Sequence, residues 1–107
     1  MTPCVTLETV RLFVRVDDEI ENPTLELMIC AATELIETRI HRPVIGEVGK
    51  GAVCASIDEV PSSIRLVACM LVGYMYEHRN ATDAELRDRC MRSMMLDDFI
   101  DWSRTEE

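Results

Sequence analysis

The most apolar helix of the chain is expected in residues 60–79, which read VPSSIRLVACMLVGYMYEHR. Apolar side chains recur every three or four residues from Ile64 to Met75, which is the period of an amphipathic α-helix. Most of the remaining positions are apolar as well, so little of the helix surface is polar. A helix of this kind lies in the centre of a domain or is covered by a partner on a second face. We therefore predict a helix over residues 61–79 that is buried on more than one side.

A second helix is predicted upstream, over residues 23–41. Asn22 is placed to be its N-cap and Pro23 to be its first helical residue, where the missing N–H of proline costs nothing. Pro43 prevents the helix from continuing. Its inner face follows the helical period, with Leu25, Met28, Ile29, Ala32, Leu35, Ile36 and Ile40.

Two flanking helices complete the expected bundle. The first covers residues 6–15, with Thr6 as its N-cap. The last covers residues 83–102, where Thr82 and Glu85 have the spacing of a capping box. These patterns predict an all-α fold, a small helical bundle of about four helices in a single domain over residues 1–107.

Residues 44–60 interrupt the helical pattern. Gly46, Gly49 and Gly51 break helices and permit turns, and residues 53–57 have the composition of a short extended stretch. The sequence leaves two structures open for this segment, which are a long projecting loop and a short β-hairpin.

Net charge restricts the classes of partner. Lysine and arginine number 11 and aspartate and glutamate number 20, so the formal net charge is −9. Proteins that grip nucleic acid use cations to neutralise phosphates, and the same holds for anionic membranes. This excess of acidic residues disfavours binding to nucleic acid and to anionic membranes. No apolar run is long enough to span a bilayer.

No pattern of catalytic, metal-binding or cofactor-binding residues stands out. Residues 46–51 read GEVGKG and lack the Ser or Thr that must follow Gly-Lys in a phosphate loop. The acidic cluster of Asp17, Asp18, Glu19 and Glu21 lacks the spacing of a calcium loop. His41 and His78 fall at expected helix ends, and the five cysteines contain no C-x-x-C pair. We predict a protein that is not an enzyme, with no cofactor and no metal, in a reducing cytoplasmic setting.

Apolar residues outside the expected core are candidates for an interface. Methionine adapts to irregular partner surfaces, and tryptophan is enriched among energetic hot spots. The alternative for the C-terminal methionines and aromatics is that they close the core of the subunit, and the sequence favours neither. The candidate interface residues are Val48, Val53, Ile57, Met70, Tyr74, Met91, Met94, Met95, Phe99 and Trp102.

The order of these features resembles the head–tail connector (adaptor) proteins of tailed bacteriophages and prophages. Residues 5–8 (VTLE) open a short helix that leads into residues 12–17 (LFVRVD), and an acidic connection and a long helix follow. The most specific part is the Val-Pro start at residue 60 with the apolar helix that ends in Tyr-Glu-His-Arg at residues 76–79. The resemblance covers residues 5–80, and the longer methionine-rich C-terminal stretch departs from the family pattern.

The resemblance implies a structural virion protein at the head–tail junction, made in the cytoplasm of the host bacterium. Such a protein would form a homo-oligomeric ring, dodecamer-like, beneath the portal protein. The ring would join the capsid to the tail through a tail-completion or stopper protein. DNA would pass through its channel without sequence-specific binding, and the family offers no catalytic residues to carry over.

The alternative reading is a small acidic binding protein, an inhibitor or regulator that acts on a protein partner. The charge suits that role, whereas the 48% apolar content and the broad apolar helix faces favour self-association. A helix-turn-helix regulator would need a cation-rich recognition helix, and residues 61–79 are apolar. The mass of the assembled protein in solution discriminates between these classes.

Overall fold

The computed structural model describes residues 3–15, 20, 22–78, 84–86, 88, 96, 99 and 100. In this part of the chain the structure is helical and contains no β-strand, which confirms the predicted all-α class. The elements are helices α1 (Leu7–Val14), α2 (Asn22–Ile40) and α3 (Ser62–Glu77), with 3-10 turns η2 (Val48–Lys50) and η3 (Ile57–Glu59) between α2 and α3.

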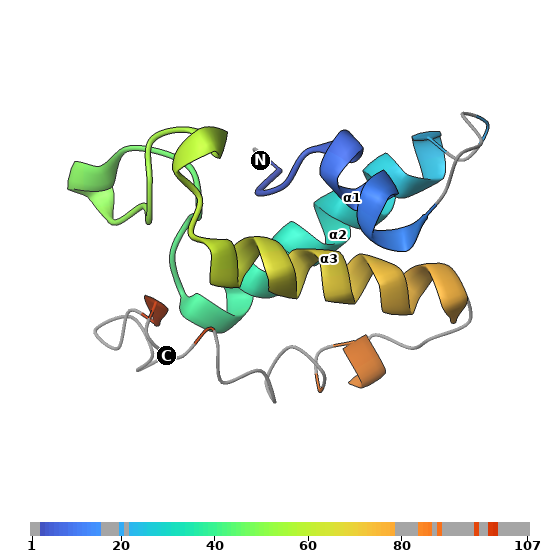
Figure 1. Cartoon of the computed structure of the whole chain (residues 1–107). Coiled ribbons are helices and arrows are strands. Elements are labelled where there is room, and N and C mark those ends of the chain that lie inside the picture. The colour runs from blue at the N-terminus through green and yellow to red at the C-terminus, as the bar shows by residue number, and fades with distance from the viewer. Residues whose placement is uncertain are drawn as a thin grey trace.

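Helix α3 packs along α2, and α1 lies against both of them (Figure 1). The connection that carries η2 and η3 extends at the end of the bundle away from α1 (Figure 1). The hydroxyl of Tyr74 in α3 donates to Glu85 Oε2 at 3.5 Å, so the helical residues 84–86 lie beside the C-terminal half of α3.

The core lies between α2 and α3, as the helical periods predict. All five residues of the predicted α3 stripe are buried, and Cys69 and Val72 beside them are buried too, so α3 is covered on more than one side. Each large aliphatic side chain buried in this way stabilises the fold by about 1.5–3 kcal/mol. The buried residues of the two facing stripes are Leu25, Ile29, Ala32, Ile36 and Ile40 from α2, and Ile64, Val67, Ala68, Leu71 and Met75 from α3.

Helix α1 ends where its local sequence predicts. The Thr9 backbone N–H donates to the Thr6 hydroxyl oxygen at 3.2 Å, so Thr6 is the expected N-cap. Arg15 closes the helix in the left-handed conformation at φ 58°, and its N–H donates to the Arg11 carbonyl.

The ends of α2 agree with the prediction in extent but not in capping. The helix begins at Asn22, which is therefore a helical residue and not the N-cap that the sequence predicts. The Asn22 Oδ1 atom is buried and has no hydrogen-bond partner among the described residues. At the other end His41 adopts φ 59° before Pro43, and the helix ends at Ile40.

The connection between α2 and α3 is a loop and not a β-hairpin. Its two limbs meet at one isolated parallel bridge between Ile45 and Cys54. The Cys54 N–H donates to the Val44 carbonyl at 2.9 Å, and the Gly46 N–H donates to the Cys54 carbonyl at 3.0 Å. A hairpin needs an antiparallel ladder. Three apolar residues of the loop are buried in the subunit, namely Val44, Ala52 and Cys54, whereas Val48 is exposed.

The C-terminal helix predicted over residues 83–102 is not one continuous α-helix. Residues 84–86 and 88 are α-helical, whereas Leu96 and Phe99 lie in 3-10 turns and Ile100 has no helical structure. Leu96 and Ile100 are nonetheless buried, and Phe99 packs against the core. The described part of this stretch therefore contributes buried side chains to the core without forming a regular α-helix.

Gly73 lies where α3 passes under α1. A Cβ added there would lie 3.6 Å from Phe13 Cε1 and 3.7 Å from Val14 Cγ1, which are ordinary contact distances. Because alanine in a helix interior is favoured over glycine, we expect Gly73→Ala to raise the free energy of unfolding by about 0.5–1 kcal/mol. Urea denaturation measures the change. The matched Gly73→Leu variant should destabilise, because its larger side chain collides with α1. A loss of stability in Gly73→Ala would contradict this spacing.

Candidate functional site

The described residues contain no group of three or more His, Cys, Asp and Glu side chains that could hold a metal ion. His41 and His78 are both exposed at helix ends. The His78 ring stacks on Tyr74 with centroids 4.2 Å apart, and its Nδ1 lies 3.1 Å from the Tyr74 carbonyl oxygen. His78 is thus the C-cap of α3. Among the described helices none is long and apolar enough to cross a membrane.

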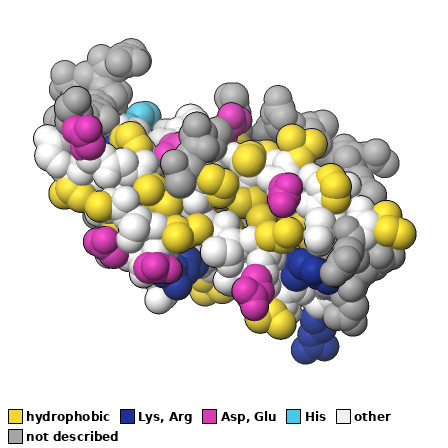
Figure 2. All heavy atoms as spheres, turned by 90° about the horizontal axis from the view of Figure 1, so that it is seen from above, with side chains coloured by type: hydrophobic (Ala, Val, Ile, Leu, Met, Phe, Trp, Pro, Cys, Tyr) yellow, Lys and Arg dark blue, Asp and Glu magenta, His cyan; other side chains and the backbone are white. Residues whose placement is uncertain are grey.

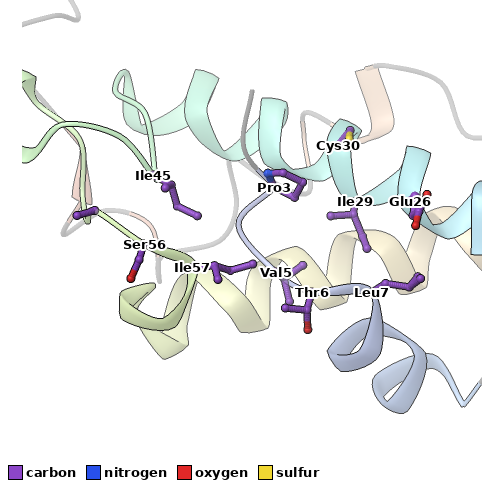
Figure 3. Close-up of a pocket in the computed structure, with 11 residues that line it drawn as sticks. Pro3, Val5, Thr6, Leu7, Glu26, Ile29, Cys30, Ile45, Ser56 and Ile57 are labelled. Carbon is purple, nitrogen blue, oxygen red and sulfur yellow. The ribbon is translucent and has the colours of Figure 1, made fainter.

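One concave feature of the described residues is a groove of about 710 Å³, which we call the amino-terminal groove (Figure 3). Three segments that are distant in the sequence form it, namely the chain before and at the start of α1, one face of α2, and the loop around η3. Its lining is mostly apolar, and Glu26 is the one charged residue among the described residues that line it. The lining comprises Pro3, Val5, Thr6, Leu7, Glu26, Ile29, Cys30, Ile45, Ala55, Ser56 and Ile57.

A buried hydroxyl holds the amino-terminal side of the groove. The Thr33 hydroxyl oxygen accepts the Cys4 N–H at 3.2 Å and donates to the Ile29 carbonyl at 2.9 Å. Cys4 and Val5 are buried against the core, while Pro3 stays partly exposed at the groove. The segment before α1 is therefore fixed to α2 by a hydrogen bond and by apolar burial together.

The loop side of the groove is held by two charged side chains. Arg65 at the start of α3 donates from Nη2 to the carbonyls of Ile57 (3.2 Å) and Asp58 (2.9 Å). Glu37 near the end of α2 accepts the Val44 N–H at 2.9 Å. Both contacts join the loop to a neighbouring helix, so that Ile57 stands on a supported backbone at the groove.

Large apolar side chains are exposed on all three helices. On α1, Leu12 is 77% exposed and Phe13 beside it is about half exposed. On α2, Leu27 is 72% exposed. On α3, Leu66 and Met70 are exposed four residues apart and so lie on one face. Figure 2 shows apolar side chains spread over one face of the subunit, with acidic side chains among and around them.

The candidate interface residues do not gather in one surface. Val48 is exposed in η2 and Met70 is exposed in the middle of α3, and the connection that carries η2 extends from one end of the bundle (Figure 1). Ile57 lines the amino-terminal groove. Val53 and Phe99 are partly buried against the core, and Tyr74 is partly buried under His78. The other four candidates lie outside the described residues, and they are Met91, Met94, Met95 and Trp102.

Two features of the surface are not among the candidate interface residues that the sequence predicts. Leu12 and Phe13 fall off the inner stripe of α1, which runs through Leu7, Val10 and Val14. Two successive large apolar residues off such a stripe are a usable signal of an exposed contact. The amino-terminal groove has no sequence signal, because it forms only when three separate segments come together.

The cysteines should differ in reactivity. Cys4 and Cys69 are buried, and burial raises the pKa of both thiols, so little reactive thiolate forms. Cys30 is partly exposed in the groove. In the unassembled subunit we expect iodoacetamide to modify Cys30 at least about tenfold faster than Cys4 or Cys69, which react only after local opening. Mass spectrometry of the digested peptides measures the order. Equal rates would show that the segment before α1 does not stay bound to α2.

These features define a class, a small α-helical protein whose described surfaces suit contacts with other proteins. Residues 4–103 match the family described as "Phage gp6-like head-tail connector protein". Because the match covers nearly the whole chain, this protein belongs to the phage head–tail connector family. The family is structural and not enzymatic, and membership makes the chain a virion component that associates with portal or tail proteins. No curated protein and no solved structure gives a significant match.

Proposed function

We propose that this connector assembles as a closed, dodecamer-like ring of single-domain subunits beneath the portal protein. The ring joins the capsid to the tail through a tail-completion or stopper protein, and DNA passes through its channel. The observation that carries the proposal is the family match over residues 4–103. The exposed apolar residues Leu12, Leu27 and Met70 support it, since an isolated subunit that exposes such side chains has surface to bury in an assembly.

The charge of the chain supports the role of a conduit. A net charge of −9 gives each subunit a negative field that repels the phosphate backbone. DNA can then slide through the ring without being held by it. The same charge favours partners with basic surfaces on the portal or stopper side.

The test is light scattering of the purified protein together with electron micrographs of the same fraction, with and without portal rings. We expect ring particles with a mass that is an integral multiple of the subunit mass, alone or bound to the portal. A protein that stays monomeric and does not bind portal rings would overturn the proposal. The alternative, an acidic inhibitor or regulator of another protein, would then be preferred.

A further inference from the structure

We propose that residues 89–95 of one subunit dock in the amino-terminal groove of the next copy. This inference rests on the proposed ring and names a contact that would build it. Residues 89–95 read RCMRSMM and lie outside the described residues, between Leu86 and Leu96. A contact between such a segment and a groove elsewhere on the subunit is heterologous, and it closes into a ring when the rotation between subunits permits.

The groove combines an apolar surface with carboxylates that have no partner in the described part of the subunit. Ile29 and Ile57 supply apolar surface, and Cys30 stands at the side of α2 (Figure 3). Glu26 precedes Cys30 by four residues and Glu34 follows it by four, so the three side chains lie on one face of α2. Both carboxylates are exposed, and neither forms a hydrogen bond or ion pair with another described residue.

Acidic residues also adjoin the other two sides of the groove. Glu8 follows the lining residue Leu7, and Asp58 follows the lining residue Ile57. Arg65 adds a cation on the loop side, where its Nη2 already donates to the carbonyls of Ile57 and Asp58. The acids around the groove therefore outnumber the cations, and a cationic apolar segment complements them.

Residues 89–95 have this complementary chemistry. They comprise two arginines, three methionines, a cysteine and a serine, with no acidic residue. Methionine is unbranched and adapts to irregular apolar surfaces. The groove volume of about 710 Å³ lies within the range of roughly 300–1,000 Å³ that buries drug-sized molecules. The groove therefore takes a few side chains of the segment and leaves the arginines at its acidic edge.

The most exposed apolar residues of the described part have the opposite charge pattern. Each has a glutamate next to it or one helical turn away, so it would bring an acid to an acidic groove. These residues are Ile20, Leu12, Leu27 and Val48. Residues 89–95 therefore complement the groove better than these residues do.

The length of the segment lets it reach a neighbouring subunit. Leu86 packs against the core and Leu96 is buried in it, so the subunit holds both ends. The ten residue steps from Leu86 to Leu96 span up to about 35 Å in an extended chain. Residues 84–86 and the chain before α1 lie on opposite sides of α3, so the segment starts away from the groove of its own subunit (Figure 1).

Two native cysteines test the contact without an introduced thiol. Cys30 stands in the groove and Cys90 belongs to the segment. Mild oxidation of the assembled wild type should give a ladder of covalent oligomers on a non-reducing gel, because docking brings the two Cα atoms within the roughly 7 Å that a disulfide needs. Cys30→Ser and Cys90→Ser are the matched controls, and each substitution alone should remove the ladder.

Charge reversal tests whether assembly needs the contact. Glu26→Arg should raise the protein concentration at half assembly by about tenfold or more, since it replaces attraction across the interface by repulsion. Light scattering over a concentration series measures this change. Glu77→Arg is the control, because Glu77 is also exposed and does not line the groove, and it should assemble like the wild type. Circular dichroism checks that both variants fold.

A charge swap separates the contact from a general effect of charge. Arg89→Glu combined with Arg92→Glu should weaken assembly as Glu26→Arg does. Addition of Glu26→Arg to this pair should restore part of the lost assembly, because the charges are again opposite. Weaker assembly of the triple variant than of either parent would contradict the inference.

The outcomes separate this inference from the ring itself. If wild-type rings form but no ladder depends on both cysteines, the inference is wrong and the ring stands. A disulfide between Cys30 and Cys90 within one chain gives a monomer band, assigns the groove to its own segment and overturns the inference. If Cys30 becomes protected from iodoacetamide only on addition of portal rings, the groove belongs to the portal and the inference is again wrong. If no ring forms alone or on the portal, the proposed function fails and the inference falls with it.

Discussion

Replacement of Leu96 by alanine should lower the free energy of unfolding by about 2–5 kcal/mol. Leu96 is fully buried, and Ile100 four residues later is buried with it. Truncation of Leu96 removes apolar contacts and leaves a cavity that the surrounding core only partly fills. For a domain of this size such a loss is a large share of the total stability of about 5–15 kcal/mol.

Urea denaturation followed by circular dichroism measures this change. The matched control is Leu27→Ala, since Leu27 is largely exposed and its truncation should change the stability by less than about 0.5 kcal/mol. An equal, small effect at both positions would show that the C-terminal residues do not belong to the core. Removal of the chain after residue 90 should then also be tolerated, which we do not expect.

This result bears on the role of the C-terminal stretch. The sequence leaves open whether its apolar residues close the core or bind a partner. Leu96 and Ile100 are buried, and Phe99 packs beside them, so these three side chains serve the core. A connector variant that is cut short before them should therefore lose stability first, and assembly only in consequence.

Thr33→Val should lower the free energy of unfolding by about 1–3 kcal/mol, although the two side chains are nearly equal in size. Valine cannot accept a hydrogen bond, so the substitution leaves the buried Cys4 N–H without the partner that it has at 3.2 Å. The buried N–H then has no hydrogen bond in place of the one it makes with water in the unfolded chain, which destabilises the folded state. The segment before α1 should detach more often, and with it one side of the amino-terminal groove.

Hydrogen exchange identifies the cause. In Thr33→Val the Cys4 amide should exchange faster than in the wild type, and iodoacetamide should reach the Cys4 thiol sooner. Thr33→Ser is the control, because it keeps the hydroxyl and loses only a methyl group, so the Cys4 amide should stay protected. Faster exchange in both variants would assign the effect to packing and not to the hydrogen bond.

Local sequence accounts for much of the helical fold. Thr6 caps α1 because a threonine side chain can accept an N–H within the first turn, which needs no distant partner. The inner faces of α2 and α3 follow from a period of 3.6 residues, and the predicted residues of both are buried except Met28 and Leu35, which are partly buried. The connector resemblance also rests on such local features, and the family match over residues 4–103 confirms it.

Capping at Asn22 is predicted wrongly, and the described residues of the expected helix over residues 83–102 are only partly α-helical. Both predictions use only residue types and spacing within a few positions of the chain. The Asn22 Oδ1 atom is buried and has no hydrogen-bond partner among the described residues, so the side chain does not cap the helix there. Leu96 and Phe99 keep a helix-like spacing, yet both lie in 3-10 turns, with Leu96 buried and Phe99 packed against the core.

The amino acid order thus determined where the chain is helical, which faces turn inward and to which family the protein belongs, because these depend on neighbours within a few residues. Folding in three dimensions decided the form of the loop and the position of the groove. Arg65, Glu37 and Thr33 hold separate segments together there through contacts with residues 7, 8 and 29 positions away. Such contacts depend on distances between elements, and helical periodicity carries no information about those distances.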